Sequence, residues 1–187
     1  RNRLPRSFYD RSPKLVAREL LGKALIRRIG DDWVGGMIVE TEAYLAEGDL
    51  ASHSARGKTA SNAAMFGQPG TLYVYPIHAK HCMNTVTENE GIGSAVLIRA
   101  IQPAWGLSVM ETNRSTQDLR RLTRGPAMLC QALQVDRSVD APNESTVWHD
   151  FDDRSTAESF ASSDELKAAM TEAGVVSAPN VWITDEA

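Results

Sequence analysis

Two carboxylates in the segment from Ile38 to Tyr44 have a spacing that suits acid–base chemistry. The segment reads Ile-Val-Glu-Thr-Glu-Ala-Tyr, so Glu40 and Glu42 lie two residues apart. Alternate side chains of a β-strand share one face, and both glutamates would then lie on the face of Ile38 and Tyr44. Repulsion between neighbouring carboxylates favours a proton on one of them, as general-acid or general-base catalysis requires. The pattern does not choose between Glu40 and Glu42, and a solvated strand face shows the same pattern.

Aromatic residues could form a pocket beside these carboxylates. Tyr73 and Tyr75 alternate along the predicted strand 71–77, so they share one face. A sheet that joins the two strands would bring Tyr44 near them, together with His53 from the loop between. Stacked aromatic rings bind flat rings that are cationic or electron-poor. The pattern therefore predicts a pocket for such a ring, although an ordinary aromatic core would explain any single tyrosine.

Arg99 lies inside an apolar run, Ala95–Ile101, that reads as a strand. An arginine in a strand interior is rarely buried without a partner. Glu40 and Glu42 are the candidate partners. Arg99 either forms a structural ion pair or uses its guanidinium to orient a carboxylate and a water molecule.

His78 and His81 flank the tip of a predicted hairpin, next to Cys82. Neither a carboxylate nor a second cysteine has the spacing that would complete a metal site, so no metal ion is expected. Glycine-rich phosphate-binding motifs are missing as well, and no other cofactor is expected. A basic hairpin tip could instead contact DNA, or simply be surface.

Turn residues and hydrophobic periodicity divide the chain into helices and strands. Helices are predicted from the Ser12-Pro13 cap to Gly22, from Pro103, over 126–134 and over 163–173. Strands are predicted over 24–29, 33–44, 71–77, 82–87, 94–101 and 181–184. Because the strands follow one another without helical crossovers, we expect an α+β fold. It would be one domain over residues 1–187, a mainly antiparallel curved sheet with flanking helices and no helix-hairpin-helix motif.

The chain has 187 residues and a net charge of −4, but the charge is unevenly distributed. Residues 1–124 carry 17 Lys and Arg against 12 Asp and Glu, a net charge of +5, and residues 125–187 carry −9. A basic body could bind a polyanion, with an acidic C-terminal third (about 136–187) kept away from it, or the two parts could simply be differently solvated faces. No apolar run is long enough to span a membrane, and with only two cysteines a cytoplasmic location is expected.

Several longer segments together resemble the alkyladenine (3-methyladenine) DNA glycosylase family. The resemblance covers roughly residues 5–140 and is carried by segments 15–28, 38–59 (IVETEAYLAEGDLASHSARGKT), 65–84 (MFGQPGTLYVYPIHAKHCMN), 95–103 and 124–133. It implies that the chain flips an alkylated or deaminated purine out of double-stranded DNA and hydrolyses its N-glycosidic bond, as a monomer and without a cofactor. Such an enzyme would be monofunctional, because no Schiff-base lysine is needed.

The resemblance also implies a role for individual residues. Glu42 matches the general base that activates water, and Arg99 matches the arginine that holds Glu42 and the water. Tyr44, His53 and Tyr75 match the walls of the base pocket. Asn84 matches the residue that disfavours guanine by crowding its exocyclic amine. His78 occupies the position of the residue that fills the gap left by the flipped nucleotide.

Three positions depart from the family pattern. His78 replaces a tyrosine, so its stacking area is smaller. Met128 replaces a lysine, and residues 178–183 replace an Arg-x-Gly motif. The acidic C-terminal third and the altered C-terminal segment leave a second class of function open, a lesion-binding module of the same fold with weak catalysis. A magnesium-dependent nuclease with paired carboxylates is a third alternative.

Overall fold

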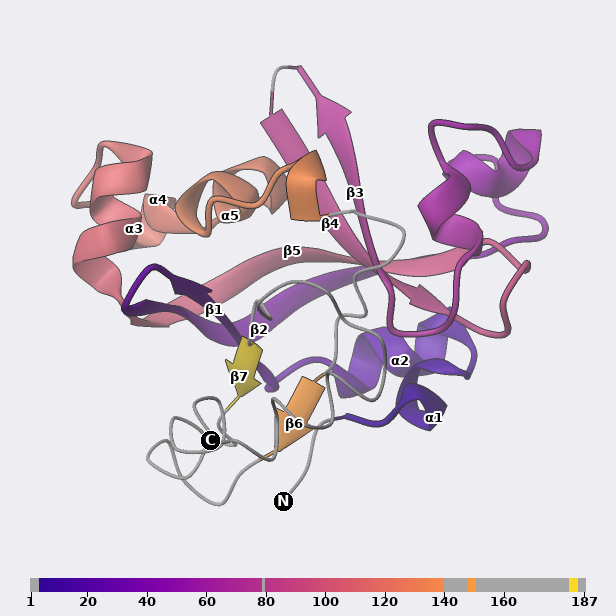
Figure 1. Cartoon of the computed structure of the whole chain (residues 1–187), viewed down its shortest axis with the longest axis horizontal. Helices are drawn as coiled ribbons and strands as arrows, with labels where there is room; N and C mark the ends of the chain where they lie inside the picture. Colours follow the sequence, from indigo (N-terminus) through magenta and orange to yellow (C-terminus); the bar gives the residue numbers. More distant parts are fainter. Residues whose placement is uncertain (1–3, 79, 140–147, 151–181, 185–187) are drawn as a thin grey trace.

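A five-stranded antiparallel sheet forms the centre of the protein. The computed structural model describes residues 4–78, 80–139, 148–150 and 182–184. The strands are β1 (Ala24–Ile29), β2 (Asp32–Tyr44), β3 (Leu72–Ile77), β4 (Lys80–Thr87) and β5 (Ser94–Trp105), in the order β1-β2-β5-β4-β3 (Figure 1). This sheet confirms the predicted α+β fold with antiparallel pairing.

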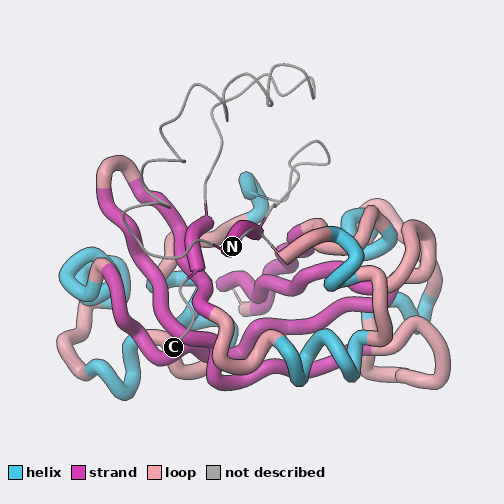
Figure 2. The backbone as a smooth tube through the Cα atoms, turned by 90° about the horizontal axis from the view of Figure 1, so that it is seen from below, coloured by secondary structure: helices cyan, strands magenta, loops and turns pink. Residues whose placement is uncertain are grey.

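Short helices flank the curled sheet, which Figure 2 shows from below. The α-helices are α1 (Arg6–Tyr9), α2 (Pro13–Glu19), α3 (Leu107–Arg114), α4 (Leu119–Leu122) and α5 (Pro126–Ala132). The 3-10 helices are η1 (His53–Arg56), η2 (Ala63–Phe66) and η3 (Arg137–Val139). Separately, β6 (Trp148–Asp150) pairs in parallel with β7 (Trp182–Thr184).

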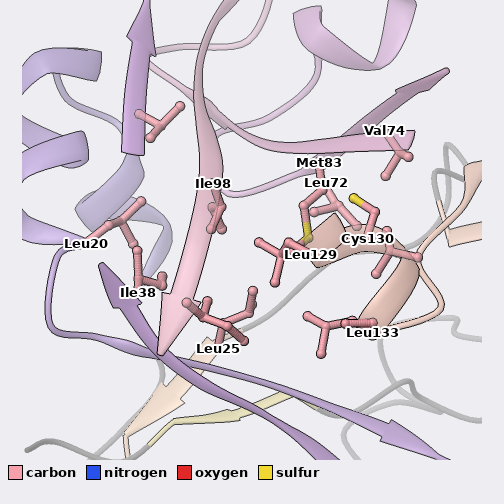
Figure 3. Packing of buried hydrophobic residues seen from close by; sticks show 14 of the residues in the cluster. Leu20, Leu25, Ile38, Leu72, Val74, Met83, Ile98, Leu129, Cys130 and Leu133 are labelled. Carbon is pink, nitrogen blue, oxygen red and sulfur yellow. The ribbon is translucent and has the colours of Figure 1, made fainter. Parts of the chain in front are cut away.

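The two faces of the curled sheet differ in what covers them. One face carries the larger hydrophobic core, in which the side chains of the sheet meet α2 and α5 (Figure 3). Members of this core include Val16, Leu20, Val74, Met83, Ile98, Leu129 and Leu133. The other face carries a smaller cluster around η2, made of Met65, Phe66, Tyr73, Val86 and Ala95. Because β4 lies between the two clusters, its residues 82–87 are all buried.

The shared face predicted for Ile38 and Glu40 is wrong. The pairing of β2 with β5 shifts between Ile38 and Glu40, and again between Glu40 and Thr41. Such a β-bulge inserts one residue and inverts the alternation of faces beyond it. Ile38 consequently packs in the larger core with Leu20 and Ile98, whereas the side chain of Glu40 is half exposed.

Pro103 does not begin a helix, in contrast to the prediction. It pairs with Gly36 inside β5, which continues to Trp105, and α3 begins only after Gly106. Proline lacks an N–H group and is tolerated in a strand where the ladder is irregular, and the register shifts here between Gly35 and Gly36.

Ser12 precedes α2 as predicted, but its side chain makes no capping hydrogen bond.

Gly36 lies where β2 and β5 approach closely. A Cβ atom at this position would overlap the backbone carbonyl of Gln102 and the Cα atom of Pro103. Gly35 has the same constraint against the carbonyl of Leu25 in β1. Only glycine therefore fits at these two positions of β2.

The remaining strands and the helix over 126–134 are confirmed to within a few residues, and 181–184 overlaps β7. The helix predicted over 163–173 lies outside the described residues, as does most of the acidic segment 136–187. Among the described residues, no helix has the length and apolar composition needed to cross a membrane.

Candidate active site

The register of the sheet places four residues in one row across the smaller-cluster face. Tyr73 in β3 pairs with Asn84 in β4, which pairs with Leu97 in β5, which pairs with Glu42 in β2. Directly opposed residues in antiparallel strands project to the same side of a sheet. Residues that are up to 55 positions apart in the chain therefore line one surface.

Arg99 holds both carboxylates of β2. Its Nη1 donates a hydrogen bond to Oε2 of Glu42 at 2.6 Å, and its Nε donates to Oε1 of Glu40 at 2.8 Å. The hydrogen bonds to Glu40 and to Glu42 raise the pKa of Arg99, so the guanidinium remains protonated. The sequence left Glu40 and Glu42 open as partners, and the structure shows that Arg99 binds both.

Aromatic side chains form a cluster next to these charges. The rings of Tyr73 and Tyr75 lie 5.8 Å apart between centroids, and the His53 ring meets Tyr75 edge-on at 4.3 Å. Tyr44 packs against the same cluster. The structure thus brings together Tyr44, His53 and Tyr75, the three predicted pocket residues.

The phenols and the imidazole of this cluster are uncharged at neutral pH. Burial, with a smaller effect from Glu42, raises the pKa of Tyr44. Burial also raises the pKa of Tyr75 and that of Cys82, which faces Tyr75 across the β3–β4 pair. Burial lowers the pKa of His53 below its usual value. A neutral, electron-rich aromatic surface therefore lies beside the carboxylates that Arg99 binds.

The loop before β3 holds His53 in place through contacts that the sequence did not reveal. His53 Nδ1 lies 2.8 Å from the Tyr73 hydroxyl, which orients the ring. The buried side chain of Asn62 donates to the backbone oxygens of His53 and Gly57, each at 3.0 Å. Asn62 lies in a polar loop without periodicity, so no local signal marks it. Tyr73 had a signal, because it shares the alternation of Tyr75.

Asn84 lies at the floor of the cluster. Its side chain is 2% exposed, and its Nδ2 donates to the backbone oxygen of Tyr73 at 3.1 Å. This hydrogen bond to β3 fixes the orientation of the Asn84 amide within the row. Asn84 is therefore a rigid, buried polar group directly opposite Tyr73 in the β3–β4 pair.

His78 lies apart from this cluster, at the tip of the β3–β4 hairpin. Ile77 pairs with Lys80, and His78 has a positive φ of 46° in the turn between them. The hairpin projects from the sheet, with α5 on one side and the η1–η2 segment on the other (Figure 1). His78 is exposed, whereas Lys80 lies 3.6 Å from the sulfur of Met128 in α5.

The arrangement has the parts of a site for base-assisted hydrolysis. A carboxylate held by an arginine can take a proton from water, and the neighbouring rings can bind a flat substrate. Within the described ranges, no group of three or more His, Cys, Asp or Glu side chains has a geometry for a metal ion.

The chain is similar to a known protein family and to several individual proteins. Residues 7–170 match the family model for methylpurine-DNA glycosylase. A protein of Rhodopirellula baltica is 60% identical over 142 residues, one of Koribacter versatilis 47% over 140, and one of Methanocella arvoryzae 46% over 139. All three carry the name "Putative 3-methyladenine DNA glycosylase".

Each match includes 73% of this chain but a smaller share of the relative. The chain spans 61% of the length of the Rhodopirellula baltica protein. The corresponding shares for the proteins of Koribacter versatilis and Methanocella arvoryzae are 68% and 70%.

Proposed function

Because the chain belongs to the methylpurine-DNA glycosylase family, we propose that it is a monofunctional DNA glycosylase for alkylated or deaminated purines. The observation that carries this proposal is the Glu42–Arg99 ion pair beside the cluster of Tyr44, His53 and Tyr75. The substrate would be double-stranded DNA that contains one damaged purine, and the enzyme would act as a monomer.

In the proposed reaction, Glu42 accepts a proton from a water molecule that attacks C1′ of the flipped nucleotide. The new bond joins C1′ to the water oxygen, while the C1′–N bond of the damaged base breaks. The electron pair of that bond leaves with the purine and neutralises the positive charge of an alkylated ring. An alkylated, cationic purine needs no protonation as it leaves, so one general base is sufficient for that class of substrate.

The aromatic cluster has the properties that such a base requires. A cationic purine is attracted to the faces of neutral tyrosines and is repelled by a charged imidazole. His53 has a lowered pKa and is neutral, which avoids that repulsion. Asn84 is held rigidly by Tyr73, and we propose that it crowds the exocyclic amine of a normal guanine.

Base flipping would begin at the β3–β4 hairpin. Extrusion of a nucleotide costs a few kcal/mol, and less for a damaged or mispaired base. We propose that His78 enters the gap in the duplex, while the net positive charge of residues 1–124 binds the phosphates.

A single-turnover assay tests the proposed activity. Duplexes with one 3-methyladenine, hypoxanthine or ethenoadenine are incubated with the protein in EDTA, and free base is measured. We expect release of at least one of these bases, with the DNA strand left intact. Selective binding without base release would instead favour the lesion-binding module, and strand cleavage that requires magnesium would favour a nuclease.

The substitution His78→Ala tests the role of the hairpin tip. We expect affinity for a lesion duplex to fall roughly tenfold, because stacking of one base on an aromatic side chain contributes about 1–3 kcal/mol. The rate of base release at saturating protein should change much less. Fluorescence anisotropy and single-turnover kinetics measure the two effects. His81→Ala removes the other histidine of the hairpin and serves as the control, and equal affinities for His78→Ala and wild type would exclude His78 as the plug.

A further inference from the structure

Glu40 occupies a position that the general base and the pocket do not account for. Its side chain lies on the same surface as Glu42 and contacts the same guanidinium. Two irregularities in the β2–β5 register surround it, and they leave Val39 in β2 and Arg99 in β5 without a directly opposed partner. The bulge therefore directs Arg99 between the two carboxylates.

The two contacts of Arg99 use different nitrogen atoms of one rigid plane. Nε binds Glu40 and Nη1 binds Glu42, so the guanidinium is held at two points. A single contact at Nη1 would leave the plane free to turn about the Cδ–Nε bond. The planar fork of arginine makes such a two-point contact geometrically specific. The contact with Glu40 thus determines where Arg99 presents its remaining N–H groups.

An exposed ion pair of this kind contributes little to folding. The side chains of Arg99, Glu40 and Glu42 are 35%, 50% and 42% exposed, respectively. Pairs in such surroundings are screened by water and add little stability. A structural role therefore does not explain why β2 supplies a second carboxylate to the same arginine.

We infer that Glu40 is a positioning residue that fixes the plane of Arg99 and, through it, the carboxylate of Glu42 and the attacking water. The inference rests on the proposed glycosylase reaction and adds a third member to its catalytic group.

Two substitutions at Glu40 separate positioning from charge. Glu40→Ala removes the acceptor of the Nε–H bond, and we expect the single-turnover rate of base release to fall roughly 10- to 100-fold, as for a misplaced catalytic group. Glu40→Gln retains a side-chain oxygen that can accept this bond, and most of the rate should return. Affinity for the lesion duplex and the urea midpoint of unfolding should stay close to wild type in both. Glu47→Ala, in the loop after β2, is the matched control.

A double-mutant cycle tests whether Glu40 acts through Arg99. In an Arg99→Ala background, Glu40→Ala should reduce the rate no further. An additional loss in that background would overturn the inference, as would a full rate for Glu40→Ala alone. Complete inactivity of Glu40→Gln, with Glu42→Gln still active, would make Glu40 the base. A wild-type protein that releases no base from any lesion would overturn the proposed function together with this inference.

Discussion

Glu42→Gln should reduce base release at least a thousandfold, near the upper part of the range of about 10²- to 10⁴-fold for general acid–base catalysis. Glutamine has nearly the shape of glutamate and its side-chain oxygen can still accept the hydrogen bond from Arg99 Nη1. It cannot take a proton from water at neutral pH, because an amide is a very weak base. Single-turnover assays on a 3-methyladenine duplex measure the loss.

Binding should survive this substitution. The rings of His53, Tyr73 and Tyr75 and the hairpin remain in place, so the affinity for a lesion duplex should remain within a fewfold of wild type. Glu47→Gln removes a carboxylate from the adjoining loop and should retain the full rate. Near-normal release by Glu42→Gln would remove Glu42 as the base and leave Glu40 as the candidate.

Gly36→Ala should destabilise the fold by about 3 kcal/mol or more, at the high end of single-substitution effects. The added methyl group would overlap the backbone of Gln102 and Pro103, and neither strand can move aside without breaking ladder pairs. Urea unfolding followed by circular dichroism measures the change in the free energy of unfolding.

Val39→Ala is a suitable control for this experiment. Val39 lies in the same strand, and its side chain is about half exposed, so the loss of two methyl groups should cost little. A change of under about 1 kcal/mol for Gly36→Ala would show that β2 and β5 can separate locally. The approach of the two strands would then not require glycine.

Much of the fold could be predicted because local signals agree with it. Gly30, Asp31 and Asp32 mark the turn between β1 and β2, and the aromatic and β-branched residues of β3 and the apolar run of β5 mark strands. The β-bulges near Glu40 left no such signal, since they arise from the pairing with β5 and not from β2 itself. Ile38 was placed on the wrong face for that reason, and Pro103 was read as a helix start because its partner Gly36 is distant in sequence.

The candidate site shows the same division. Alternation was sufficient to group Tyr73 with Tyr75, and an arginine in an apolar strand implied an acidic partner. The two-point binding of Arg99 and the hydrogen bonds of Asn62 could not be predicted, because each joins loops or strands whose spacing is set by the whole sheet. The roles of Glu42 as general base, of Asn84 and of His78 come from the family resemblance and not from these residue patterns.

The division of the sheet into two faces has a consequence for how readily this protein can acquire new specificity. Side chains such as Tyr75 and Asn84 project to one face, whereas their neighbours Val74 and Met83 belong to the larger core. Replacing a partly exposed member of this face, such as Tyr75, therefore leaves the side chains of the larger core in place. Combinatorial libraries that vary only Tyr44, His53, Tyr75 and Asn84 should yield a high proportion of folded variants, from which enzymes for other damaged bases can be selected.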